Sequence, residues 1–325
     1  MRSVRFGLFC LLLVGGLSAC GDDGRRAPSR GGDGAGDGGG TGTPDGGTIG
    51  GRDAGDCTPT QEGASSATCS DGVDNDCDFQ VDCADADCSG VGECPVCGEV
   101  ETPLGSPLAL PDGVGGSSCT SDSDCPSDQS CFEIDDILGG TTNECRESYR
   151  STLNFTGFGN GAFESADDIL SVCVVMEHSF LRDLEITLQA PNGRQVRLQR
   201  FLGQDGGEIY LGQADDCDDD DAPTPGTGAT YCWTPTSSRA SMLDYANGGG
   251  AMDSVTDCNG FGDVEMLPPG DYSAADDWSA FVGSSLNGEW TLLVTDLWGI
   301  DNGYIFEWSI AFDPRTVADC SVPLI

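Results

Sequence analysis

The sequence predicts a mainly β protein: an antiparallel β-sandwich over residues 150–315, preceded by small disulfide-rich modules and a disordered linker. From residue 150 onward, apolar and polar side chains alternate over short stretches, which is the pattern of strands with one buried face. Gly, Asn and Pro turns separate these stretches. No segment has the apolar spacing of a long amphipathic helix, so two packed sheets are the expected architecture.

Two stretches show the alternation most clearly. Leu184, Ile186 and Leu188 alternate with polar residues, and the turn 191–193 that follows them predicts a β-hairpin. Near the C-terminus, Ile305 is expected to lie on the opposite face of a strand from the aromatic side chains. That aromatic face is expected to be core and carries Tyr304, Phe306, Trp308, Ile310 and Phe312.

The first 19 residues have the layout of a signal peptide. Arg2 and Arg5 precede an apolar run over residues 6–14 that is too short to cross a bilayer as a helix. Residues 20–56 are dominated by Gly with scattered polar residues, which is typical of a flexible linker.

The segment Leu17-Ser18-Ala19-Cys20 resembles the lipobox of bacterial lipoproteins. This resemblance implies that Cys20 is lipidated, becomes the mature N-terminus and anchors the chain in a lipid bilayer. Gly21, with no Asp at that position, favours the outer membrane by the same resemblance, on its periplasmic face or at the cell surface. The alternative is an ordinary signal peptide that ends near Ala19.

Charge and cysteine content limit the compartment and the partners. The chain has 55 acidic and 14 basic residues and a formal net charge of -41, so its field repels polyanions and nucleic acid is not an expected partner. Its 18 cysteines are too many for a reducing cytosol. Without Cys10 and Cys20 their number is even, and we expect most of them to form disulfides.

Residues 57–97 are rich in Asp and Cys and contain almost no large apolar side chain. Six of them have the spacing of the ligands in an EF-hand Ca²⁺ loop, although Phe79 replaces its turn glycine and the last acid is Asp rather than Glu. The segment also resembles thrombospondin type 3 repeats and a family named after a bacterial copper-binding surface protein. Oxygen ligands without His or Met favour calcium over copper. The expected ligands are Asp74, Asp76, Asp78, Gln80, Asp82 and Asp85.

Two alternatives remain open for this segment. Its acids could be solvated charges on a disulfide-linked linker. Cys94-Pro95-Val96-Cys97 could suggest zinc, but a single CxxC in an oxidising compartment favours disulfide bonding.

A second module, residues 119–145, resembles small four-cysteine modules of secreted proteins and is expected to be a structural staple. Its cysteines allow three pairings, which the sequence leaves open: Cys119, Cys125, Cys131 and Cys145.

The remaining cysteines suggest two further bridges. An acidic loop over residues 215–221 is expected to be closed by a bridge from Cys217 to Cys232. This loop could bind a second cation or be a solvated charge run. Residues 57–97 and residues 150–325 each hold an odd number of cysteines. Either a bridge joins them, with Cys97 and Cys320 as the candidates, or two thiols stay free.

Two segments of the sandwich resemble the motifs of the P domain, also called the Homo B domain. The first is 177–193, with His178, Asp183 and the turn Pro191-Asn192-Gly193; the second is 286–296, followed by Asp301-Asn302-Gly303 and Trp308-Ser309-Ile310. The resemblance implies a jelly-roll sandwich. Residues 108–113, which include Pro111-Asp112, resemble its first strand. This places a strand within 104–118, makes 119–145 an insertion, and leaves 316–325 as a tail.

P domains accompany subtilisin-like proprotein convertases, but this chain is not expected to be an enzyme. Such a protease needs Ser, His and Asp on a separate catalytic domain, and His178 is the only histidine. We expect a non-catalytic, membrane-anchored lipoprotein that presents the sandwich for binding a protein or a glycan. The alternatives are an accessory subunit of a separately encoded subtilisin-like protease and a structural protein of the cell envelope.

Overall fold

The structure is a computed structural model that describes residues 59–77, 80–94, 96–113, 116–135, 140–159, 161–201, 207–214, 224–257, 260, 262–299, 301 and 303–325. The predicted signal peptide, Cys20, the linker, Asp78, Cys217 and the acidic loop 215–221 lie outside these residues. Among the residues described, no helix is long and apolar enough to cross a membrane.

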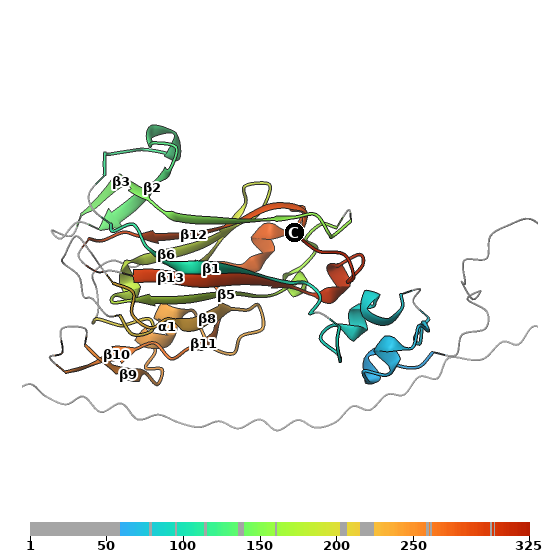
Figure 1. The fold of residues 1–325 in the computed structure, drawn as a ribbon. Helices are drawn as coiled ribbons and strands as arrows, with labels where there is room; N and C mark the ends of the chain where they lie inside the picture. The colour runs from blue at the N-terminus through green and yellow to red at the C-terminus, as the bar shows by residue number, and fades with distance from the viewer. Residues whose placement is uncertain are drawn as a thin grey trace, which may run out of the picture. The chain divides into compact units, whose positions relative to one another are not determined.

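The prediction of a mainly β fold is confirmed (Figure 1). One sheet has five strands in the order β1-β13-β5-β8-β11: Glu99–Ala109, Gly303–Phe312, Ile169–His178, Ala229–Trp233 and Gly270–Tyr272. The other sheet has four strands in the order β4-β12-β6-β7: Tyr149–Phe155, Gly288–Asp296, Leu184–Gln189 and Gln195–Gln199. All neighbours pair antiparallel except β8 and β11, which are parallel.

The two large sheets pack face to face through aromatic side chains. Phe312 of β13 contacts Phe155 of β4 and Trp290 of β12, with ring centroids 5.3 and 5.5 Å apart. The indole N–H of Trp308 in β13 also crosses between the sheets and donates to Ser151 Oγ at 2.8 Å. The rings of Phe155 and Phe312 carry no polar atom, and the indole N–H of Trp290 donates to the nearby Leu286 carbonyl. The interface is therefore an apolar core.

Smaller elements lie outside the two large sheets. Two short hairpins are formed by β2 (Gln129–Asp135) with β3 (Thr141–Glu147), and by β9 (Asp253–Thr256) with β10 (Asp263–Met266). The one α-helix of the described residues is α1, Met242–Asn247. Short 3-10 helices span Glu62–Ala64, Thr68–Ser70, Asp82–Ala84, Ala86–Cys88, Asp122–Asp124, Ala166–Asp168, Leu181–Asp183, Trp278–Phe281 and Pro314–Thr316.

The alternating pattern predicted the hairpin β6–β7 correctly. Leu184, Ile186 and Leu188 are fully buried, and the turn closes with Gly193 at φ 83°, a conformation that favours glycine. In β13 the pattern was wrong at one point. A β-bulge shifts the register between Ile305 and Glu307, so Ile305 is fully buried while Phe306 is only half-buried against Gly228.

The chain before the four cysteines belongs to the sandwich. Strand β1 runs over Glu99–Ala109, earlier than the expected span of 104–118, and pairs with β13. The four-cysteine hairpin, residues 117–147, follows β1 and precedes β4. At the other end of the chain the tail packs on the sandwich, because Leu324 is 7% exposed and its carbonyl accepts from the Thr156 N–H.

Six disulfides have both of their cysteines among the described residues, which is typical of a protein in an oxidising, exported environment. The expected bridge between Cys97 and Cys320 is confirmed, and it links the segment 59–97, here called the Asp/Cys module, to the C-terminal tail. The expected pairing of Cys232 with Cys217 is wrong, because Cys232 lies directly opposite Cys173 on the neighbouring strand and bonds to it. The others are Cys69–Cys88, Cys83–Cys94, Cys119–Cys131 and Cys125–Cys145.

Candidate functional site

The described members of the predicted calcium loop lie in the Asp/Cys module, where Asp76 and Gln80 are half-buried. Three of the acids accept hydrogen bonds from backbone N–H groups in different turns: Asp74 from Cys77 (2.7 Å), Asp82 from Gly72 (3.0 and 3.2 Å) and Asp85 from Asp87 (2.7 Å). No three carboxylates of the described part of this module bring their oxygens within 4.8 Å of one another. Calcium binding by this loop therefore stays a prediction.

Glu62 organises this loop, and the sequence pattern did not reveal it. It is fully buried, and its two carboxylate oxygens accept from the N–H groups of Asn75 (2.6 Å) and Asp82 (3.1 Å). The side chain thus connects both ends of the segment 75–82. A charge-assisted bond of this kind is about twice as strong as a neutral one, so Glu62 fixes the loop that carries the predicted ligands.

A second group of acids gathers at the end of the sandwich farthest from the Asp/Cys module. Glu99 of β1 pairs with Ala311 near that module, whereas Ala109 pairs with Tyr304 at the opposite end of the two strands. At this far end, which we define as residues 110–113, 178–183, 296–299 and 301, three connections meet (Figure 1). They follow β1, join β5 to β6, and join β12 to β13.

The far end brings together an aspartate from each segment that resembles a P-domain motif: Asp112, Asp183, Asp296 and Asp301. Asp183 is fully buried, and no N–H or O–H group of the fold donates to either of its carboxylate oxygens, while the Asp301 carboxyl lies within hydrogen-bonding reach. Burial, and secondarily the charges of Asp296 and Asp301, raise the pKa of Asp183 to about 9. Burial also raises the pKa of Asp296 well above its usual value.

His178 is held within the same end of the sandwich and is fully buried. Its Nε2 lies 3.2 Å from Asp296 Oδ2, and its Nδ1 accepts from the Phe180 N–H at 2.9 Å. Because Nδ1 is an acceptor, the proton of the neutral ring is on Nε2 and is donated to Asp296. Burial lowers the pKa of His178 to about 4. Neither ring nitrogen is left to take a proton from a nucleophile.

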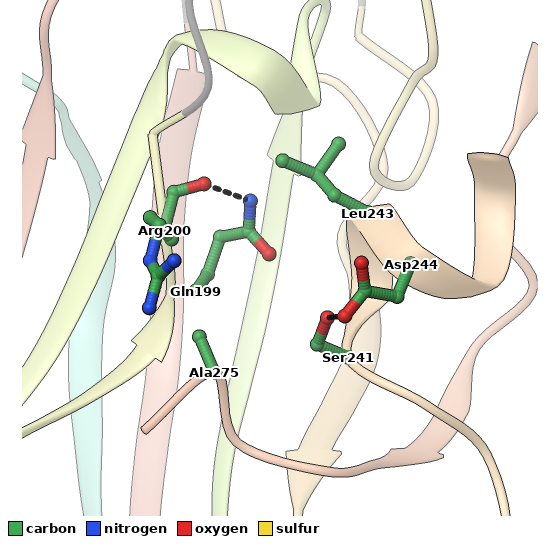
Figure 2. Close-up of a pocket in the computed structure, with 6 residues that line it drawn as sticks. All are labelled: Gln199, Arg200, Ser241, Leu243, Asp244 and Ala275. Carbon is green, nitrogen blue, oxygen red and sulfur yellow. Dashed lines mark hydrogen bonds between the residues drawn. The ribbon is translucent and has the colours of Figure 1, made fainter.

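A shallow pocket lies elsewhere on the sandwich, between the end of β7 and α1 (Figure 2). Its cavity volume is about 100 Å³, which is room for about three water molecules and well below the 300 Å³ or more of a typical small-molecule site. The close-up shows Asp244 bonded to Ser241, and Arg200 outside that contact. This pocket could hold one polar group of a larger ligand but not a whole substrate.

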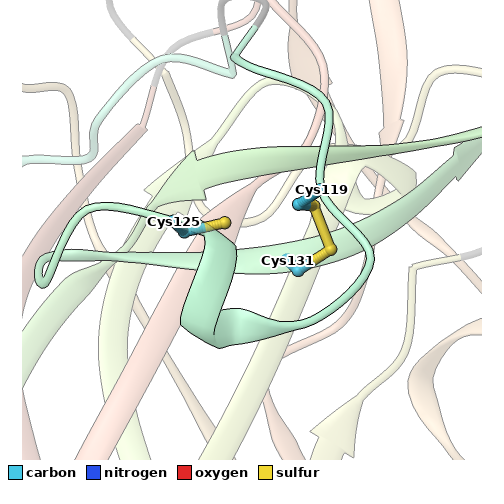
Figure 3. A group of neighbouring side chains, drawn as sticks. All are labelled: Cys119, Cys125 and Cys131. Carbon is cyan, nitrogen blue, oxygen red and sulfur yellow. A yellow bond between two sulfur atoms is a disulfide. The ribbon is translucent and has the colours of Figure 1, made fainter.

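The sulfur atoms of Cys119, Cys125 and Cys131 lie within 4.8 Å of one another, as in a metal site (Figure 3). However, Cys119 is bonded to Cys131, and Cys125 is bonded to Cys145. A metal needs a thiolate, which a disulfide sulfur is not. These cysteines are therefore cross-links of the four-cysteine hairpin.

Comparison with known proteins adds little to this description. No family model and no curated protein matches the chain. Among solved structures, a serine protease of Aeromonas sobria aligns at 16% identity over 67% of this chain and 27% of the protease, with a TM-score of 0.24. An exo-β-agarase aligns at 11% identity over 58% of this chain and 24% of the agarase, with a TM-score of 0.20. The chain thus spans about a quarter of each protein, and these scores assign no family.

Proposed function

We propose that this protein is an exported, non-catalytic binding protein that is tethered to a membrane by lipid on Cys20. In this proposal residues 20–56 are the flexible tether, and the far end of the sandwich, together with the four-cysteine hairpin that follows its first connection, recognises a protein or a glycan. The P-domain resemblance of the sandwich supports a role in protein interaction. The net charge of -41 makes a polyanion an unsuitable ligand.

The observation that carries this proposal is the bridge between Cys97 and Cys320. It closes the chain covalently at the end of the sandwich where β1 begins and β13 ends. Strand β1 has 11 residues, so the opposite end lies roughly 30 Å away at about 3.3 Å per residue. A tether that enters through the Asp/Cys module is thereby attached at one end, and the four-cysteine hairpin and the far end remain available for a ligand.

The absence of catalysis in this proposal is supported by His178. Hydrolysis by Ser, His and Asp requires an imidazole nitrogen that takes the proton of the serine hydroxyl. The imidazole of this chain is fully buried, and both of its nitrogens are engaged with Asp296 and Phe180. The small volume of the pocket beside α1 is also unsuited to enclosing a substrate.

Binding of the tagged mature chain to cell envelopes of the producing organism tests this proposal. We expect saturable binding that is lost when exposed residues of the four-cysteine hairpin are reversed in charge or enlarged, as in Asp128→Arg with Thr142→Arg. Val322→Arg, an exposed change in the C-terminal tail, is the matched control and should bind normally. Treating the envelopes with protease or with periodate distinguishes a protein ligand from a glycan. Equal binding by both variants would contradict recognition through that end.

The tether is tested separately by fractionation. The wild-type chain should sediment with membranes and be released by detergent, whereas Cys20→Ser should be recovered in the soluble fraction. If a subtilisin-like protease is recovered with the wild-type chain in stoichiometric amount, the accessory-subunit alternative replaces the recognition proposal.

A further inference from the structure

Asp183 is the most unusual side chain of the sandwich. Its backbone is fixed, because its N–H donates to the Phe180 carbonyl and its carbonyl accepts from the Leu297 N–H. Its carboxylate is fully buried and has no donor for either oxygen. Burying an ionised carboxylate without a partner costs several kcal/mol, so a stable fold needs something at this position to compensate for the charge.

No basic side chain supplies that compensation. All 14 basic residues of the chain are arginines, and no ion pair among the described residues includes Asp112, Asp183 or Asp301. Arg182, the neighbour of Asp183 in sequence, donates instead to the Gly207 carbonyl and to Asn247.

The neighbouring acids differ in how many of their oxygens are already used. Both oxygens of Asp296 are engaged, Oδ1 by the Trp298 N–H at 3.0 Å and Oδ2 by His178 at 3.2 Å. Asp301 is half-buried, and one of its oxygens accepts from the Ser179 hydroxyl at 3.1 Å. Asp296 is therefore fixed by its own hydrogen bonds, whereas Asp183 and Asp301 keep oxygens for another partner.

Asp112 brings a third carboxylate from the connection after β1. A Cβ at Gly299 would lie 3.3 Å from Asp112 Oδ1 and 3.8 Å from the Gly113 carbonyl oxygen. Gly299 thus leaves open the space between this connection and the one that carries Asp296 and Asp301. Asp112 is exposed and Asp301 is half-buried, so the group has buried Asp183 on its inner side and reaches solvent on its outer side.

A proton and a cation are the two ways to neutralise this group. A proton shared by Asp183 and Asp301 would satisfy one pair and leave Asp112 without a role. A divalent cation would use all three carboxylates and would offset the repulsion between their charges. In the part of the chain that the structure describes, no three of these carboxylates have oxygens within 4.8 Å of one another. An ion would therefore draw the two outer connections toward Asp183.

We propose that the far end of the sandwich is a calcium site in which Asp183, Asp301 and Asp112 are ligands and Asp296, held by His178, is a positioning residue. Calcium fits better than magnesium because it accepts 6–8 oxygen ligands in flexible geometry, as expected for ligands on separate connections. Zinc and copper favour nitrogen or sulfur ligands, and the one histidine is already engaged. This proposal does not depend on the proposed recognition function.

Thermal unfolding and calcium calorimetry on the full mature chain, with all disulfides intact, test this site. With calcium at about 100 times its Kd, we expect Tm to rise by roughly 5–10 °C over the value in EDTA. Magnesium at the same concentration should raise Tm less. The side chain of Asp183→Asn is nearly isosteric and uncharged, so this variant should unfold in EDTA at or above the wild-type temperature and should gain little from calcium.

Two further variants keep the result interpretable. Asp301→Asn lies on the outer connection and should reduce the calcium shift even if Asp183→Asn does not fold. Glu289→Gln changes an exposed acid of β12 that belongs to neither predicted calcium site and should keep the full shift. The proposal is overturned if calcium does not raise the Tm of the wild-type chain, which would favour the shared proton, or if Asp183→Asn and Asp301→Asn keep the wild-type shift.

Discussion

The Asp/Cys module and the β-sandwich belong to one chain but are stabilised by different means. Among the described residues of the module, the buried cluster that is separate from the sandwich consists of Cys69, Cys88 and Cys94, and two disulfides run through it. The sandwich has a continuous apolar core from both large sheets. A segment as short as the module cannot bury enough apolar surface to fold, so covalent links take the place of a core.

Each region also contains a buried acid, and the two acids differ in their hydrogen-bond donors. Glu62 in the module has a backbone N–H for each oxygen, whereas Asp183 in the sandwich has a donor for neither. Both are fully buried, so burial alone does not distinguish a structural acid from a candidate ligand. The number of hydrogen-bond donors that face the carboxylate distinguishes the two kinds of acid. Glu62 is already satisfied by the fold, and Asp183 requires a partner from outside it.

The largest expected effect comes from the sandwich core. Trp290→Ala removes a fully buried indole that contacts Phe281 and Phe312, and we expect it to lower the free energy of unfolding by about 3–5 kcal/mol. Val282→Ala, a change at an exposed position, should stay within about 0.5 kcal/mol of wild type. Urea unfolding followed by tryptophan fluorescence measures both. A small loss for Trp290→Ala would mean that disulfides, rather than burial, also stabilise the sandwich.

The corresponding change in the module removes a cross-link. Replacing Cys69 and Cys88 by Ser opens a bridge between residues 19 apart, and for a loop of this size the expected loss is about 3 kcal/mol. We expect hydrogen exchange to accelerate over residues 59–97 while the amides of β12 and β6 stay protected. If protection of β12 falls equally, the two regions unfold as one unit and the contrast between them does not hold.

Glu62→Gln tests the satisfied acid. The substitution keeps the shape but turns an NH₂ group toward one of the two backbone N–H donors, so we expect a loss of roughly 1–3 kcal/mol, confined to the module. Hydrogen exchange at Asn75 and Asp82 is the measurement, because these two amides donate to the carboxylate. Exposed Glu289→Gln is the control and should leave both amides unchanged.

The smallest effect is the pH dependence of His178. Its pKa of about 4 in the folded chain lies below the ordinary value of 6.5, so its contribution to stability is complete above pH 6.5 and is lost as pH falls toward 4. At pH 5.5 the loss is about 1.4 kcal/mol. Asp183 acts in the opposite direction without calcium, because its raised pKa stabilises the fold at low pH and that contribution is lost as pH rises toward 9.

The difference between wild type and His178→Gln isolates the histidine, since both chains contain Asp183. Unfolding free energies of the two proteins, measured with urea at pH 7.5 and pH 5.5, should converge by about 1.4 kcal/mol at the lower pH. Parallel pH profiles would show that His178 is not neutral in the folded chain.

The sequence was informative where a residue acts through local spacing. Alternation located β6 and the turn to β7. Cysteine parity left two alternatives, a bridge with Cys97 and Cys320 as candidates or two free thiols, and the structure has the bridge. The sequence failed at the bulge in β13 and at Cys232, since a register shift and a cross-strand neighbour are set by pairing between distant strands. Asp183 and Asp301 were visible as parts of motifs, but their proximity to Asp112 depends on how three connections meet in space. Glu62 carried no pattern at all.

The bridge between Cys97 and Cys320 also has a mechanical consequence. If a ligand bound at the far end pulls against the proposed membrane anchor, tension that enters the sandwich through residue 97 divides between β1 and the C-terminal tail. Both paths run along the length of the five-stranded sheet, so its hydrogen bonds are loaded in shear, as a group, rather than peeled one at a time. The covalent ring of residues 97–320 also keeps the sandwich from unravelling from its N-terminal side, so a load applied there would be carried by the whole sheet.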